Sequence, residues 1–124
     1  MNMKLIVAGL VGFLAVALAA FGAHGLPATL PDIQRNAYMT GGQFHLAHAL
    51  LLAALALGPR SARLAWSYGA ILLGTAIFCG VLYAYALTGN GRIAMFAPVG
   101  GLTLMIGWLL LAAAGLGGGP RREA

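Results

Sequence analysis

Charged side chains are the scarcest group in this sequence. Of its 124 residues, 7% are charged and only two are acidic, whereas 61% are hydrophobic. A soluble domain typically carries about 25% charged residues, so this chain lacks the polar surface that a water-exposed fold needs. The net charge of +5 comes from basic residues scattered at the ends of apolar segments. That distribution argues against nucleic-acid binding and favours contact with anionic lipid headgroups.

Residue combinations typical of catalysis are also missing. Cys79 is the only cysteine and lies within an apolar run, so an intramolecular disulfide is excluded and the thiol is expected to be inert packing. The sequence contains no paired carboxylates within a span, no glycine-rich phosphate loop before a basic residue and no nucleophile beside a base. The apolar segments hold no charged residue, which argues against a proton-driven pump.

Four apolar segments approach or exceed the length of about 20 residues that a helix needs to cross a bilayer. We therefore predict a single all-α integral-membrane domain over residues 1–124, folded as a four-transmembrane-helix bundle. Its spans are expected at about 5–23, 40–57, 64–87 and 93–116, followed by a flexible tail at 117–124.

The first segment also has features of a secretory signal peptide, because Lys4 precedes an apolar core that ends in small residues. Small residues recur along it at helical spacing, however, a pattern that lets a second helix approach closely. We therefore expect the segment to be retained as a span. The recurring small residues are Ala8, Gly12, Ala15, Ala19 and Gly22.

The connection after the first span predicts a short interfacial helix. Pro31 and Asp32 suit a first helical turn, and apolar residues follow at helical spacing. Gly41 and Gly42 would then allow a bend into the second span. Gly25 is expected to end the first helix in a left-handed cap.

The later spans have irregularities of their own. Pro98 is expected to kink the fourth span, and the pair Gly100 and Gly101 to loosen it. One face of the third span predicts a small-residue packing seam that ends in a phenol. The seam residues are Gly69, Leu73, Ala76, Gly80, Tyr83 and Leu87.

Four spans place both termini and the second connection on one side of the membrane. That side carries five basic residues, whereas the other carries Arg35 and Arg92. The positive-inside rule then predicts that both termini are cytoplasmic. The five residues are Lys4, Arg60, Arg63, Arg121 and Arg122.

All three histidines are predicted near the opposite, outer end. His45 and His48 stand at i, i+3, a spacing that metal sites use, and His24 is the nearest third ligand. Gln43 and Tyr83 complete a candidate polar cluster that would also suit a haem, proton or quinone site. A zinc site normally needs three or four ligands with supporting carboxylates, and acids are scarce here. No bound metal or other cofactor is therefore predicted.

A structural role is the favoured interpretation of the histidines. Polar side chains buried in membranes form interhelical hydrogen bonds worth about 0.6–2 kcal/mol each. We expect His24 and His48 to take part in a hydrogen-bonded joint between the first two helices, with His45 incidental.

Four ordered motifs resemble a bacterial membrane-protein family. They are residues 20–26, residues 43–50, residues 78–83, and residues 98–101 followed by Gly107-Trp108. Together they make the chain similar to the family catalogued as domain of unknown function 423, whose eukaryotic relatives are called transmembrane protein 256. The resemblance implies a small multi-span inner-membrane protein without a settled activity.

The resemblance also singles out particular residues. It includes His24, His48 and Tyr83 but not His45. The family favours serine in place of Cys79 and Val81 and threonine in place of Ala97, so any role of those hydroxyl groups would be missing here. The motif backbone positions that match are Gly22, Gly25, Gly80, Pro98, Gly100 and Gly101.

The function expected from these patterns is a non-enzymatic structural, assembly or accessory role in the lipid bilayer, within a homo-oligomer or a larger membrane complex. Two alternatives stay open. One is a histidine-based metal, haem or quinone site near the outer leaflet, and the other is a small-solute pore or carrier.

Overall fold

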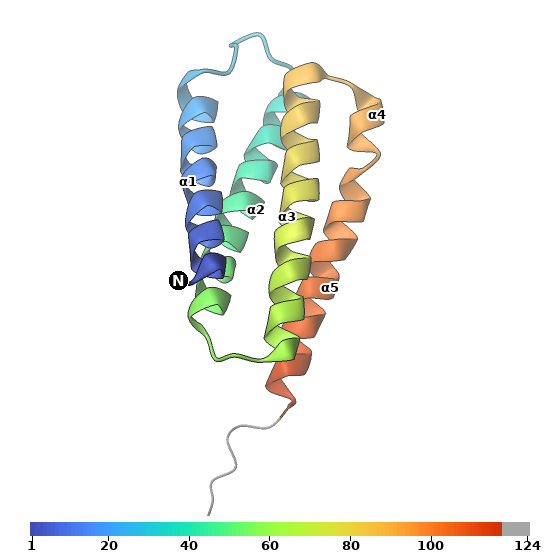
Figure 1. The fold of residues 1–124 in the computed structure, drawn as a ribbon. Helices are drawn as coiled ribbons and strands as arrows, with labels where there is room; N and C mark the ends of the chain where they lie inside the picture. The colour runs from blue at the N-terminus through green and yellow to red at the C-terminus, as the bar shows by residue number, and fades with distance from the viewer. Residues whose placement is uncertain (118–124) are drawn as a thin grey trace, which may run out of the picture.

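Four long helices, each antiparallel to the one before it, form the bundle in the computed structural model (Figure 1), which describes residues 1–117. All four are long and apolar enough to cross a membrane, with the last span counted from Gly91 to Gly115. The predicted all-α, four-span class is therefore confirmed. The tail predicted at 117–124 lies, apart from Gly117, outside the described residues. The helices are α1 (Met3–His24), α2 (Asp32–Leu57), α3 (Ala62–Thr88), the short α4 (Gly91–Ala94) and α5 (Ala97–Gly115).

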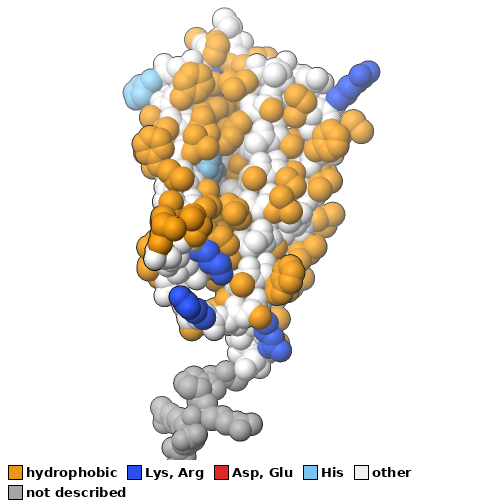
Figure 2. All heavy atoms as spheres, in the orientation of Figure 1, with side chains coloured by type: hydrophobic (Ala, Val, Ile, Leu, Met, Phe, Trp, Pro, Cys, Tyr) orange, Lys and Arg blue, Asp and Glu red, His pale blue; other side chains and the backbone are white. Residues whose placement is uncertain are grey.

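The helices pack in the order in which they follow one another. α2 lies against α1 and α3, and α3 lies against α5. The start of α1 and the α2–α3 connection are at one end of the bundle, and the α1–α2 and α3–α4 connections are at the other (Figure 1). On the face drawn in Figure 2, hydrophobic side chains cover most of the length, and most of the visible Lys and Arg side chains lie toward the end with the α2–α3 connection.

The interior is filled by apolar side chains contributed by every long helix. Leu52 of α2 and Ile71 of α3 have no exposed surface, and Ala8 of α1, Tyr68 of α3 and Leu104 of α5 join them in one cluster. The outward faces of the helices are then in contact with lipid, which suits a chain with so few charged residues.

The predicted separate interfacial helix is wrong, because α2 continues without a break from Asp32 to Leu57. Pro31 and Asp32 do begin it, as expected. Gly41 does not bend the helix but lets it approach α3: a Cβ added there would lie 3.3 Å from the Cβ of Leu82. The missing side chain thus serves packing between two spans.

Two predictions about helix ends also need correction. Gly25 follows α1 with φ −109°, a right-handed conformation, and an added Cβ would lie 2.6 Å from the Phe21 ring, so the position needs space. The left-handed cap is Gly89, with φ +66°, at the end of α3. Pro98 stands in the first turn of α5, where proline displaces no hydrogen bond, so the break at Met95 precedes it and no mid-helix kink forms.

Candidate functional site

The stretch from Gln43 to His48 lies in the middle of α2 and presents its two histidines to different neighbours. Residues three apart on a helix point about 60° apart, so His45 contacts α3 whereas His48 contacts α5. Both side chains are buried, with 5% and 6% of their surface exposed. The two rings therefore belong to two separate polar contacts rather than to one cluster.

The first contact joins His45 to Tyr83. Nδ1 of His45 lies 3.0 Å from the Tyr83 hydroxyl oxygen, and the two ring centroids are 5.9 Å apart. Tyr38 packs against the other face of this pair, with its ring centroid 5.0 Å from that of Tyr83. The Tyr38 hydroxyl in turn donates to the Leu18 carbonyl of α1. His45, which the sequence interpretation treated as incidental, thus belongs to a polar and aromatic layer that connects three helices.

The second contact uses both ring nitrogens of His48. Nδ1 lies 2.7 Å from the Phe44 carbonyl oxygen, which can only accept, so Nδ1 donates. Nε2 must then accept, and the Trp108 indole N–H donates to it over 3.1 Å. The Phe44 ring also stacks on the imidazole, at 5.7 Å between centroids and 16° between planes. A neutral His48 in this tautomer has no nitrogen left for a metal or substrate.

The other predicted members of the polar cluster stay outside these contacts. His24 and Gln43 are exposed, and the predicted joint between His24 and His48 is wrong. The reason is that α2 runs without a break from Asp32, which places His48 about 24 Å along the helix from the end at which α1 finishes with His24. At that end the Tyr38 ring packs against Gly22 instead. Within residues 1–117, no three His, Cys, Asp or Glu side chains come close enough to hold a metal ion.

Within residues 1–117, α3 and α5 approach each other backbone to backbone. A Cβ added to Gly74 would lie 2.7 Å from the Leu104 backbone nitrogen, and one added to Gly107 would lie 2.6 Å from Ile71 Cδ1. Gly100 similarly faces the backbone of Phe78.

Other glycines of the sequence motifs have looser surroundings. Gly101 approaches the Phe78 ring at 3.8 Å, whereas an added Cβ at Gly80 would meet nothing within 4 Å. The seam predicted on α3 from Gly69 to Leu87 is therefore not the face that packs against α5. On α1, the predicted stripe does pack against α2 through Ala8, Gly12, Ala15 and Gly22, whereas Ala19 is exposed.

A cavity of about 290 Å³ lies between α1 and α3, with His45 of α2 in its lining. We call it the α1–α3 groove. Its walls are almost entirely apolar, and small residues of the open α3 seam form part of one wall. The lining residues are Val11, Leu14, Leu18, His45, Leu72, Thr75, Ala76, Cys79, Gly80 and Tyr83.

Sequence reasoning missed two functional neighbours of the histidines. Trp108 is predicted only as part of a motif, although its indole N–H donates to Nε2 of His48. Tyr38 was assigned to an interfacial helix, although its side chain is 2% exposed within the bundle. Each of these residues is far along the chain from the side chains that it contacts, so no local sequence pattern indicates the contact.

The family described as "Protein of unknown function (DUF423)" matches residues 18–101 of this chain, which include α2, α3 and the start of α5. The chain belongs to the DUF423 family.

Curated relatives of this DUF423 protein are similar over nearly the whole length. The UPF0382 inner membrane protein YgdD of Escherichia coli K12 is 36% identical over 110 residues, which cover 86% of this chain and 84% of YgdD. A UPF0382 membrane protein of Haemophilus influenzae is 36% identical over 90% of this chain and 91% of its own. YwdK of Bacillus subtilis, also a UPF0382 membrane protein, is 33% identical over 92% and 96%. No solved structure matches.

These relatives agree with the fold in one respect that matters for function. Their printed names describe membrane proteins, and YgdD is an inner membrane protein. Together with the four apolar helices, they make this DUF423 protein a small multi-span membrane protein.

Proposed function

We propose that this protein is a non-enzymatic accessory component of the bacterial inner membrane, which binds a transmembrane helix of a partner protein in the α1–α3 groove. The proposal rests on a contrast between polar groups and packing surface. Within residues 1–117, no buried side-chain nitrogen or oxygen lacks a hydrogen-bond partner. The polar groups that chemistry would need are thus used to hold the bundle together.

By contrast, a surface suited to packing against another helix remains uncovered beside the groove. Gly80 and Ala76 line one wall, and an added Cβ at Gly80 would meet no atom within 4 Å. Leu73, on the same seam, is 56% exposed. Small residues allow close approach of a second membrane helix, which is what drives association where lipid and protein are equally apolar. The open seam therefore supports a helix-binding role.

Purification from native membranes in mild detergent tests this role. The wild-type protein is expected to elute with a partner membrane protein, identified by mass spectrometry. Gly80→Leu should fill the groove and remove that partner. Gly9→Leu is the matched control, because Gly9 of α1 is also open, with nothing within 4 Å, but does not line the groove.

Other results would contradict the proposal. A monomer without partner in every mild detergent would rule out the accessory role. If the protein forms a homodimer that Gly80→Leu dissociates, a second copy of this chain, and not another protein, occupies the groove.

A second candidate function is supported by the His45–Tyr83 contact, because both side chains line an apolar groove. A hydroxyl and an imidazole together would bind the polar head of a quinone-like molecule. Organic extraction of the purified protein followed by chromatography would reveal such a molecule, with Tyr83→Phe as the variant expected to lose it. The same sample would show haem by its absorption spectrum. A pore through one copy is disfavoured by the fully buried Leu52 and Ile71 between the helices.

We also propose that both termini are cytoplasmic. The support is the concentration of basic residues at the end that holds Lys4, Arg60 and Arg63. Reporter fusions after Ala124 should be active in the cytoplasm, and fusions in the α1–α2 connection in the periplasm. The reverse pattern would contradict this orientation.

A further inference from the structure

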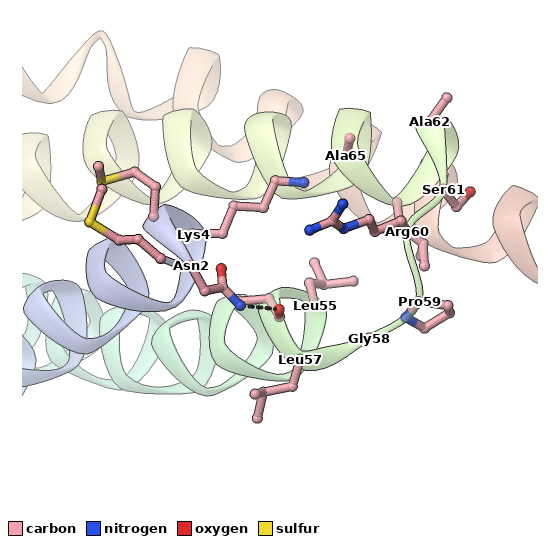
Figure 3. A pocket seen from close by; sticks show the side chains of 14 residues that line it. Asn2, Lys4, Leu55, Leu57, Gly58, Pro59, Arg60, Ser61, Ala62 and Ala65 are labelled. Carbon is pink, nitrogen blue, oxygen red and sulfur yellow. Dashed lines mark hydrogen bonds between the residues drawn. The ribbon is translucent and has the colours of Figure 1, made fainter.

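A second, larger cavity lies at the end of the bundle where α1 begins. It has a volume of about 770 Å³ and is bounded by the first residues of α1, the last turn of α2 and the α2–α3 connection (Figure 3). We call it the basal pocket. Unlike the α1–α3 groove, it has polar and charged groups in its lining. The polar and charged side chains in its lining are Asn2, Lys4, Arg60 and Ser61.

Two cations extend into the basal pocket from different elements. Lys4 comes from the first turn of α1 and Arg60 from the α2–α3 connection, and Figure 3 draws their charged ends pointing into the same space. Within residues 1–117, Asp32 is the only acidic residue, and it begins α2 at the opposite end. Two like charges that share a pocket without a carboxylate favour an anionic ligand between them.

The protein holds the Lys4 side of the pocket in place. The Lys4 ammonium lies 5.4 Å from the centroid of the Tyr68 ring, and the Tyr68 hydroxyl donates to the Lys4 carbonyl over 2.7 Å. Asn2 accepts from the Leu5 backbone N–H and donates to the Ala56 carbonyl, which connects the start of α1 to the last turn of α2. These contacts preorganise the wall from which the cation projects.

The start of α3 adds further donors. Ser61 precedes the helix in an extended conformation, and its side chain makes no capping hydrogen bond. The first backbone N–H groups of an α-helix have no partner within the helix and carry the positive end of its dipole. Ser61, Ala62 and Leu64 line the pocket, so the helix start supplies neutral N–H donors at its edge, whereas Figure 3 draws the Ser61 hydroxyl pointing away from the charged ends of Lys4 and Arg60.

We propose that the basal pocket binds a phosphate group, supplied by an anionic glycerophospholipid at the membrane surface. Cationic side chains together with a helix N-terminus are a combination that binds phosphate oxygens. The location favours a lipid over free phosphate, because the pocket lies at one end of the membrane-spanning bundle. Leu55, Leu57 and Leu64 in its lining also provide apolar contact for the glyceryl and acyl parts.

Arg63 provides a matched control within the same connection. Its guanidinium donates to the Ala113 carbonyl of α5 over 3.2 Å, and it does not line the pocket. Replacing Arg60 or Arg63 by glutamine therefore removes the same charge from the same part of the membrane surface. Only the first replacement removes it from the pocket.

Native mass spectrometry of the full chain in detergent tests the proposal, with phosphatidylglycerol and phosphatidylcholine of identical acyl chains as probes. The wild type should bind phosphatidylglycerol more tightly. Arg60→Gln and Lys4→Gln should each weaken that binding about fivefold, and the double variant about 25-fold, from the usual contribution of one basic residue at an anionic surface. Arg63→Gln should leave it unchanged. Thermal unfolding of each variant establishes that it is folded, and Arg60→Lys, which keeps the charge, should retain most of the binding.

Inorganic phosphate distinguishes the two sources of the anion. Under the proposal, millimolar phosphate does not displace phosphatidylglycerol. Displacement by free phosphate, with equal loss in the Arg60 variant, would replace the lipid by a soluble anion as the ligand. Equal weakening by Arg60→Gln and Arg63→Gln, or equal affinity for the two lipids, would show unspecific surface attraction and overturn the site.

Discussion

The two sides of this bundle are held together in different ways. Between α3 and α5, backbones approach so closely that Gly74, Gly100 and Gly107 have no room for a side chain. Between α1 and α2, an added Cβ at Gly12 would make an ordinary contact of 3.9 Å with Ala49, and the one close approach, 2.5 Å at Gly22, is to the Tyr38 side chain rather than to backbone. Backbone therefore meets backbone between α3 and α5, whereas α1 and α2 come close through side chains.

The difference coincides with the location of both proposed binding regions. The α1–α3 groove and the basal pocket each include residues of α1, and neither includes a residue of α5. α1 is joined to the rest by the hydroxyl groups of Tyr38 and Tyr68, which donate to the carbonyls of Leu18 and Lys4 near its two ends. The fold thus combines a fixed α3–α5 support with a more open α1 side where ligands and partners have access.

Among the substitutions that test this comparison, Gly100→Ala should lower the free energy of unfolding the most. The new methyl group would overlap the Phe78 backbone, and overpacking of this kind costs about 3 kcal/mol. Gly80→Ala is the control: its Cβ enters open space, and the higher helix propensity of alanine should add up to about 1 kcal/mol of stability. Unfolding in detergent, followed by circular dichroism, measures both. Equal stability of the two variants would mean that the α3–α5 contact is not tight.

The same two glycines illustrate what the sequence can and cannot predict. Length and hydropathy predict four spans because every stretch of helix in contact with lipid must be apolar. The sequence does not distinguish Gly80 from Gly100, because the difference depends on whether another backbone lies beside the residue. For the same reason Gly41 was interpreted as a bend, although it allows α2 to approach α3.

The candidate site was predicted less completely than the fold. His48 and Tyr83 were identified as polar groups within apolar segments, which is unusual enough to be informative. Their partners were not identified, because His48 and Trp108 are 60 residues apart and His45 and Tyr83 are 38 residues apart. Helical periodicity indicates which residues share a face, but not which helix that face contacts.

Ser67→Ala should have an intermediate effect. The Ser67 hydroxyl has no exposed surface and donates to the Gly107 carbonyl across the α3–α5 contact, over 2.8 Å. Loss of this hydrogen bond should lower the free energy of unfolding by about 1 kcal/mol. Thr103→Ala is the control, because the Thr103 hydroxyl bonds to the Val99 carbonyl of its own helix, and should change stability by less than about 0.5 kcal/mol. A larger loss for the control would show that the bond across the contact is not what matters.

The smallest difference is expected between the coupling energies of the two histidine contacts. A double-mutant cycle with His48→Leu and Trp108→Phe should give a coupling energy of about 0.6 kcal/mol, the average for hydrogen bonds between membrane helices. The cycle with His45→Leu and Tyr83→Phe should give less. Tyr83 lines the α1–α3 groove, which leaves its side chain more room to move when His45 is removed. Trp108, by contrast, donates to Nε2 of an imidazole whose Nδ1 is fixed by its bond to the Phe44 carbonyl. A larger coupling for His45 and Tyr83 would mean that the contact beside the groove, between α2 and α3, is held at least as firmly as the one between α2 and α5.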